Sequence, residues 1–133
     1  MKRLLCTALL SLSCVAAYAE WQVVSEGTGG KVYVDFDRSV REKDSTKIWA
    51  LIDFKSQRET DEEKKVSYLS VLIHFEFDCR KRLAKQTRTL YFSESMGSGK
   101  QVDSSWGRGF FDDIVPNTLD EMVFNSVCKQ RKN

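Results

Sequence analysis

Three segments of the chain alternate apolar and polar residues with a period of two. They are residues 31–37, 46–57 and 66–79. The third segment has the longest apolar series, which is Leu69, Val71, Ile73, Phe75, Phe77 and Cys79. Because successive side chains of a strand point to opposite faces, this period predicts β-strands with one buried face. Cys79 is therefore expected on the core side of a sheet.

Weaker signals add strands before and after this series. Residues 21–26 and 101–105 are short strand candidates, and residues 82–95 form a longer one that contains Thr and aromatic residues. The polar residues 38–45 and the charged residues 58–65 are expected to be turns between strands.

One helix is predicted near the C-terminus. Pro116 precedes a capping box formed by Thr118 and Glu121, which marks a helix start. The apolar residues at helical spacing are Leu119, Met122, Val123 and Val127. A helix of about 11 residues is not stable alone in water, so it is expected to pack on the sheet.

The chain begins with the features of a secretory signal peptide. Lys2 and Arg3 are followed by an apolar run from Leu4 to Ala17, and Ala17-Tyr18-Ala19 is a small-x-small cleavage site. The run is shorter than the roughly 18 residues of a membrane-spanning helix. These features predict a signal peptide at 1–19 and export through the Sec pathway.

The exported part, residues 20–133, is expected to be a single domain in the periplasm or at the cell surface. Cleavage before Cys14 with lipidation is the alternative, but Ser11 stands where a lipoprotein signal has a bulky apolar residue. No apolar run of roughly 18 residues follows either, so no transmembrane segment is expected in the exported part.

Cys79 and Cys128 remain after the signal peptide is removed. An even pair of cysteines in an exported protein indicates a disulfide, which here would hold the helix against the sheet. Closing the loop of about 50 residues between them contributes on the order of 4 kcal/mol to the free energy of unfolding. The alternatives are a redox pair or metal ligands, but the chain has no C-x-x-C motif and one histidine.

Removing Lys2 and Arg3 leaves 19 basic and 19 acidic residues, and the basic excess lies in the second half. Its densest basic cluster is Arg80, Lys81, Arg82, Lys85 and Arg88. In a regular strand Arg80, Arg82 and Arg88 would share one face and the lysines the other. The cluster is a candidate binding surface for an anionic partner. The alternative is a solvated edge strand whose charges prevent aggregation.

Residues 95–100, SMGSGK, raise the question of a phosphate-binding loop. A P-loop requires Gly at position 94 and Ser or Thr at position 101, whereas the chain has Glu94 and Gln101. A glycine turn between two strands is therefore expected. His74 has no second imidazole or thiolate beside it in its strand, and there is no G-x-S-x-G motif. The sequence predicts no catalytic residue, no metal site and no cofactor.

Short motifs in a consistent order resemble the surface-adhesin protein E family of small exported bacterial proteins. The motifs are Trp21, Tyr33-Val34-Asp35, Ser39-Val40-Arg41, Ile48-Trp49-x-Leu51-Ile52-Asp53, Phe75-x-Phe77-Asp78-Cys79, Met96-Gly97-x-Gly99, Trp106, Pro116-x-Thr118 and Val127-Cys128. Residues 106–115 are longer and richer in Gly and Phe than the family pattern.

The resemblance implies an α+β fold, with an antiparallel sheet of about five to six strands and one C-terminal helix tied to it by the disulfide. It also implies a non-enzymatic binding protein whose partner is a host-matrix or cell-envelope protein. A nucleic acid is not expected as the partner, because the protein is exported. A periplasmic accessory protein without adhesin activity is the alternative.

Overall fold

The computed structural model describes residues 20–129. The expected signal peptide and Cys14 lie outside the described residues. The strands are β1 (Gln22–Glu26), β2 (Gly30–Arg41), β3 (Thr46–Glu59), β4 (Ser67–Asp78), β5 (Leu83–Phe92), β6 (Gln101–Trp106) and β7 (Asp112–Asp113). The α-helix is α1 (Leu119–Cys128), and Ser95–Gly97 form one turn of 3-10 helix.

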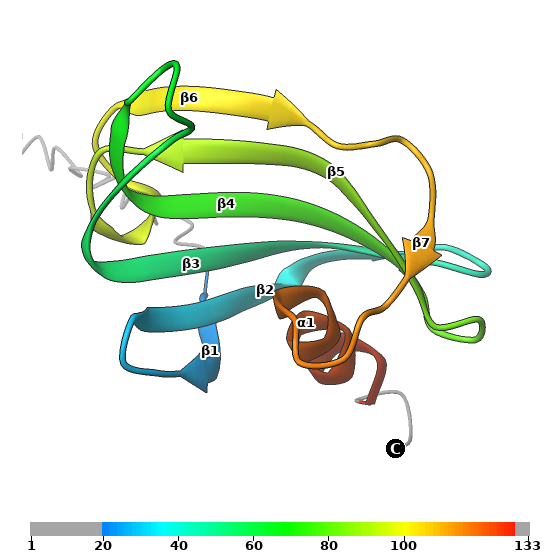
Figure 1. Cartoon of the computed structure of the whole chain (residues 1–133). Coiled ribbons are helices and arrows are strands. Elements are labelled where there is room, and N and C mark those ends of the chain that lie inside the picture. Colours follow the sequence, from blue (N-terminus) through cyan, green and yellow to red (C-terminus); the bar gives the residue numbers. More distant parts are fainter. Residues whose placement is uncertain (1–19, 130–133) are drawn as a thin grey trace, which may run out of the picture.

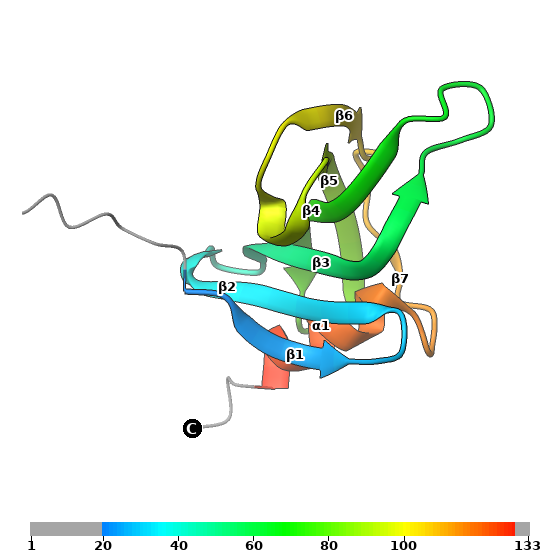
Figure 2. The same ribbon diagram turned by 90° about the vertical axis from the view of Figure 1, so that its left-hand side faces the viewer.

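The strands β1 to β6 form one antiparallel sheet in chain order. The two-residue strand β7 pairs with the start of β5, on the edge that β6 occupies further along. Short connections between consecutive strands favour this arrangement, because antiparallel neighbours need only a tight turn. Figure 1 shows the resulting meander with α1 on one side, and Figure 2 shows the curvature of the sheet around the helix.

The hydrophobic core lies between α1 and the side of the sheet that carries Ile48, Ile73 and Phe75, which we call the helix face. The opposite side, which carries Trp49, His74 and Arg88, is called the open face. The core cluster is Val34, Ile48, Ala50, Val71, Ile73, Phe75, Phe77, Ala84, Val123, Phe124 and Val127. The alternation in the sequence therefore predicted the helix face of the central strands correctly.

Cys79 and Cys128 form the expected disulfide, with 5.6 Å between their Cα atoms. It joins the residue after β4 to the last residue of α1. The helix starts as the capping box predicts, because Thr118 Oγ1 accepts a hydrogen bond from Glu121 N at 3.4 Å. The Glu121 carboxylate in turn accepts from Asn117 N at 2.8 Å. The α+β fold class is thus confirmed, together with its disulfide.

Several boundaries differ from the sequence prediction. Residues 38–41 belong to β2 rather than to a turn, and the pairing register with β3 shifts between Asp35 and Val40. The shift has a local cause, because Asp35 Oδ1 accepts a hydrogen bond from Arg38 N at 3.2 Å. Such a side-chain bond to the backbone competes with the ladder between strands.

Three side chains also take positions that simple periodicity did not predict. Tyr68 packs against the core, although alternation with Leu69 places it on the opposite face from the predicted core series, because a register shift between β3 and β4 breaks the alternation there. In α1, Met122 is exposed and Phe124 is buried instead. Phe124 packs edge-on against Phe77 at 5.7 Å between ring centroids.

The SMGSGK segment is the glycine turn that the sequence predicts between β5 and β6. Met96, Gly97 and Gly99 have positive φ angles of 58°, 68° and 74°. The turn folds back over the open face, where a Cβ on Gly97 would come within 2.7 Å of Leu72. This contact explains how Leu51, which lies beside Leu72 on the open face, is fully buried.

Candidate functional site

The basic cluster of the sequence divides into two parts in the structure. Arg80 and Lys81 lie in the turn between β4 and β5, where Asp78 Oδ1 accepts from both backbone N–H groups at 3.0 and 2.9 Å. Arg82 has a positive φ of 57°, and its guanidinium lies 5.0 Å above the Phe124 ring. These three residues stay at one end of the sheet.

Lys85 and Arg88 lie further along β5, on the open face. Lys85 Nζ forms an ion pair with Glu76 at 2.7 Å and lies 4.7 Å above the Phe111 ring. Arg88 lies 5.0 Å above the Trp106 ring. The expectation that Arg88 shares a face with Arg82 was wrong, because the register with β4 skips Thr87 and reverses the alternation.

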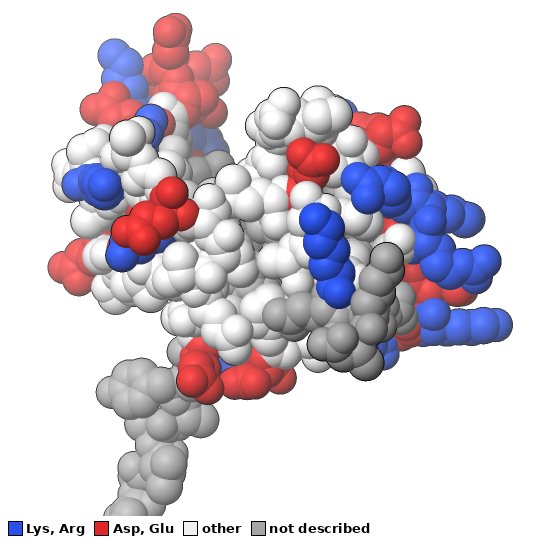
Figure 3. Space-filling view, turned by 90° about the horizontal axis from the view of Figure 1, so that it is seen from below, with Lys and Arg blue, Asp and Glu red and all other residues white. Residues whose placement is uncertain are grey.

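A second turn adds basic residues to the end of the sheet that holds Arg80 and Lys81. Arg41 and Lys43 are exposed in and beside the turn between β2 and β3. Arg80 Nη1 lies 3.7 Å from Asp44 Oδ1, so the two turns are neighbours. Figure 3 shows Lys and Arg side chains gathered at this end of the molecule. We call Arg41, Lys43, Arg80, Lys81 and Arg82 the basic end.

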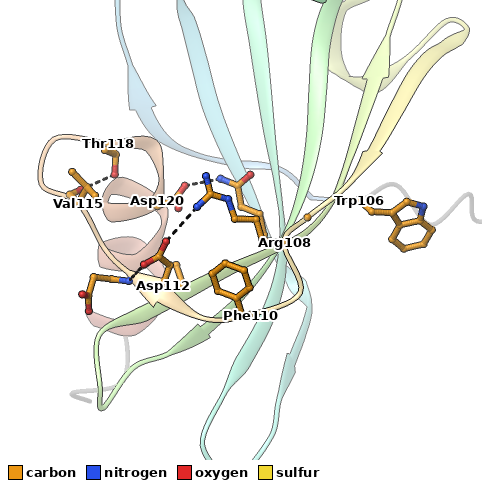
Figure 4. Close-up of a pocket in the computed structure, with 11 residues that line it drawn as sticks. Trp106, Arg108, Phe110, Asp112, Val115, Thr118 and Asp120 are labelled. Carbon is orange, nitrogen blue, oxygen red and sulfur yellow. Dashed lines mark hydrogen bonds and ion pairs between the residues drawn. The ribbon is translucent and has the colours of Figure 1, made fainter.

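A hollow of about 410 Å³ lies between the start of β5, the start of α1 and the loop that joins β6 to α1. Its lining residues are Ala84, Gln86, Trp106, Gly107, Arg108, Phe110, Asp112, Asp113, Val115, Thr118 and Asp120. Figure 4 shows this loop arching over the hollow, with the Trp106 side chain directed away from it. Phe110 and Val115 are 57% and 60% exposed, so the hollow has apolar side chains open to solvent.

Polar contacts hold the shape of the hollow. Gln86 Nε2 donates to Asp120 Oδ1 at 2.9 Å, which connects β5 to the first turn of α1. Arg108 Nη1 lies 3.6 Å from Asp112 Oδ2, within the loop (Figure 4). Asp113 and Asp120 add carboxylates without a second arginine among the lining residues, so the net charge of the lining is negative.

Gly107 is the point where the loop leaves β6 and passes close to β5. Its N–H donates to Thr87 O at 3.0 Å, and a Cβ at this position would lie 1.5 Å from Gln86 O. Only glycine allows this approach of two backbones. The hollow therefore depends on Gly107 beside Trp106, in the segment 106–115 that stands out in the sequence only by its length and its Gly and Phe content.

Glu76 and His74, on the open face, have pKa values below their usual ones. Burial alone would raise the pKa of Glu76, but hydrogen bonds from Lys85 and Ser45 lower it below its usual value. Burial lowers the pKa of His74, and the nearby Lys47 ammonium lowers it further. At neutral pH Glu76 is therefore charged and His74 is neutral.

Residues 21–129 match the protein family described as Surface-adhesin protein E. The chain belongs to this family. Three solved structures of Haemophilus influenzae protein E have the same fold. One, a second crystal form, has a TM-score of 0.57 at 15% sequence identity and covers 80% of this chain and 92% of that chain. The others have TM-scores of 0.54 and 0.56 at 16% and 15% identity, again cover 80% of this chain, and cover 89% and 75% of theirs. No curated protein sequence matches the chain.

The surface-adhesin protein E family accounts for the fold and for an adhesin-like surface protein, but it does not assign a binding residue in this chain. Within residues 20–129 no three His, Cys, Asp or Glu side chains come together as a metal site would require. Nor does this part of the chain contain a helix with the length and apolar composition that a membrane span needs. The hollow and the basic end are thus the two candidate sites.

Proposed function

We propose that this member of the surface-adhesin protein E family is an exported, non-enzymatic binding protein that attaches to an extracellular host protein through the hollow. The observation that carries the proposal is the exposure of Phe110 and Val115 beside the carboxylates of Asp113 and Asp120. Exposed apolar side chains with a polar rim are typical of protein-binding sites. Export through the Sec pathway, with residues 1–19 removed, is part of this proposal.

The charge of the hollow indicates which partner segment fits. Asp112 is paired with Arg108, whereas no ion pair with Asp113 or Asp120 occurs within residues 20–129. A partner segment with apolar residues next to Lys or Arg would bury the Phe110 ring and neutralise these carboxylates. This contact predicts binding that weakens when salt is added, because rim charges are screened.

The test measures retention of the purified protein on immobilised extracellular-matrix extract. Phe110→Ser and Val115→Ser should each lower retention several-fold, because they remove apolar area from the contact. Val40→Ser is the matched control, since Val40 is 53% exposed but lies in β2 away from the hollow. Equal retention of all variants would refute the role of the hollow.

Localisation in the cell distinguishes this function from the alternative, which is a periplasmic accessory protein that contacts another envelope component. Surface exposure in the native cell supports adhesion. A protein found only in the soluble periplasmic pool would favour the accessory role. Fractionation with protease accessibility of intact cells distinguishes the two.

The basic end is a second candidate contact, for an anionic surface. It retains Arg80, Lys81 and Arg82 from the cluster predicted in the sequence, whereas Lys85 is neutralised by Glu76. Retention on heparin should fall when Arg80, Lys81 and Arg82 are replaced together by Ser, and its salt dependence should become weaker. Unchanged retention would remove this candidate. Lys55→Ser, Lys65→Ser and Lys100→Ser together, which lie in β3, the turn between β3 and β4 and the SMGSGK turn, remove the same number of charges and provide a control for lost net charge.

A further inference from the structure

A row of paired residues crosses five strands on the open face. The register places Asp35 opposite Trp49, Trp49 opposite His74, His74 opposite Arg88, and Arg88 opposite Trp106. Neighbouring strands are about 4.8 Å apart, so the four residues from Trp49 to Trp106 span roughly 14 Å. The row runs across the strands rather than along them.

Aromatic rings in this row lie against polar groups. Trp49 and His74 have ring centroids 4.8 Å apart, and the Arg88 guanidinium lies 5.0 Å above the Trp106 ring. Trp106 is nevertheless 79% exposed, and its side chain points away from the hollow (Figure 4). Arg88 covers one face of the indole, so the other face is open to a ligand.

Arg88 is the cation of this surface that can receive an anion. Its neighbours are already paired, because Lys85 binds Glu76 at 2.7 Å and Lys47 binds Glu42 at 2.9 Å. No ion pair to Arg88 occurs within residues 20–129. Stacking uses the flat face of a guanidinium and leaves its N–H edge, which binds a carboxylate through two parallel hydrogen bonds.

His74 offers a hydrogen-bond acceptor in the same row. Thr87 Oγ1 donates to the His74 carbonyl at 3.2 Å and therefore accepts from Nδ1 at 2.5 Å. This assigns the ring proton of neutral His74 to Nδ1 and leaves Nε2 as an acceptor. Nε2 has no partner within residues 20–129 and is not among the buried polar atoms, so it remains in contact with solvent.

We propose that Trp49, His74, Arg88 and Trp106 bind an extended glycan that carries carboxylate groups. A sugar ring stacks its C–H face on the open side of Trp106, its carboxylate binds the Arg88 guanidinium, and a hydroxyl of the next sugar donates to His74 Nε2. A peptide that joins a sheet pairs with an edge strand. A ligand that follows this row instead crosses the strands, and it must supply hydroxyl donors and an anion at a spacing of several ångströms.

The test uses two oligosaccharides that differ in charge, measured by titration calorimetry with the purified protein. Hyaluronan hexasaccharide alternates N-acetylglucosamine with a carboxylate-bearing sugar, and chitin hexasaccharide contains only N-acetylglucosamine. Hyaluronan should bind more tightly by about tenfold, since a charged hydrogen bond to Arg88 contributes about this factor. Binding should also change the tryptophan fluorescence.

Variants separate the two contacts. Arg88→Gln should lower hyaluronan affinity to that of chitin, whereas Trp106→Ala should weaken both ligands about tenfold. Arg58→Gln is the matched control, because Arg58 also stacks on an aromatic ring, that of Phe54 at 5.0 Å, but lies outside the row. Circular dichroism and thermal unfolding verify that each variant is folded.

Three results would overturn the proposal. They are no hyaluronan binding, unchanged affinity in both Arg88→Gln and Trp106→Ala, and equally tight binding of poly-glutamate, which would indicate an acidic peptide instead. The proposal is independent of the hollow, since Phe110→Ser should leave hyaluronan affinity unchanged. Failure of one site is therefore distinguishable from failure of the other.

Discussion

The disulfide between Cys79 and Cys128 joins the end of β4 to the last turn of α1, so the one α-helix of residues 20–129 is covalently attached to a central strand. The helix has ten residues, and such a short helix is not stable in water without tertiary contacts. Its buried side chains, Val123, Phe124 and Val127, all lie within two turns of Cys128. The bond therefore keeps the apolar face of α1 on the sheet.

Replacing both cysteines by serine should lower the free energy of unfolding by about 4 kcal/mol, because the unfolded chain gains the entropy of an open 49-residue loop. Urea unfolding of the wild-type protein with and without reductant measures the same quantity. Free-thiol labelling of the native protein should find no reactive group at either position. Two reactive thiols, or a loss below about 1 kcal/mol, would contradict this prediction.

The sequence predicted the fold where one local rule acts alone. Alternation identified the core positions of β3 and β4, and Thr118 with Glu121 marked the start of α1. It failed where a bulge changes the alternation, as at Thr87 and Tyr68, since a single unpaired residue reverses every later side chain on that strand.

The candidate sites were less predictable for a related reason. Arg80 and Arg41 are far apart in the chain, and only the neighbouring turns bring them to one end of the sheet. The row from Trp49 to Trp106 depends on the pairing register of four strands. A pairing register depends on both strands of a pair, so the sequence of one strand does not determine it.

Gly107 should be among the least tolerant exposed positions of the protein. In Gly107→Ala the new Cβ would lie 1.5 Å from Gln86 O, so the loop must move away from β5. The expected loss is about 2 kcal/mol or more, as for other substitutions that force backbone shifts. Gly27→Ala is the control, since a Cβ there meets nothing within 4 Å and should change stability by less than about 0.5 kcal/mol. Equal thermal stability of the two variants would disprove the close approach.

Thr118 caps α1, and Thr118→Ala should cost about 1 kcal/mol because Glu121 N loses its acceptor. Ser126→Ala removes a hydroxyl from the same helix, but that hydroxyl donates to Val123 O inside the helix. Alanine favours the helix at such a position, so this control should be neutral or slightly stabilising. Urea midpoints at constant slope compare the two variants, and the opposite order would contradict the capping role.

Acidification should destabilise the protein in two separate pH windows, because His74 and Glu76 both have pKa values below their ordinary ones in the folded state. The unfolded chain then binds more protons than the folded chain, so the free energy of unfolding falls as the pH falls. For His74 the loss begins below the unfolded pKa of 6.5 and ends below the folded one. For Glu76 the loss of stability begins below 4.5, since protonation weakens the contacts with Lys85 and Ser45.

Urea unfolding from pH 8 to pH 3 measures both windows. His74→Gln should abolish the slope of the upper window. Glu76→Gln should reduce the slope of the lower window, and it should also steepen the upper one, because loss of the Glu76 charge lowers the pKa of His74 further. A stability that is flat between pH 7 and pH 5 in the wild-type protein would refute the assignment of His74.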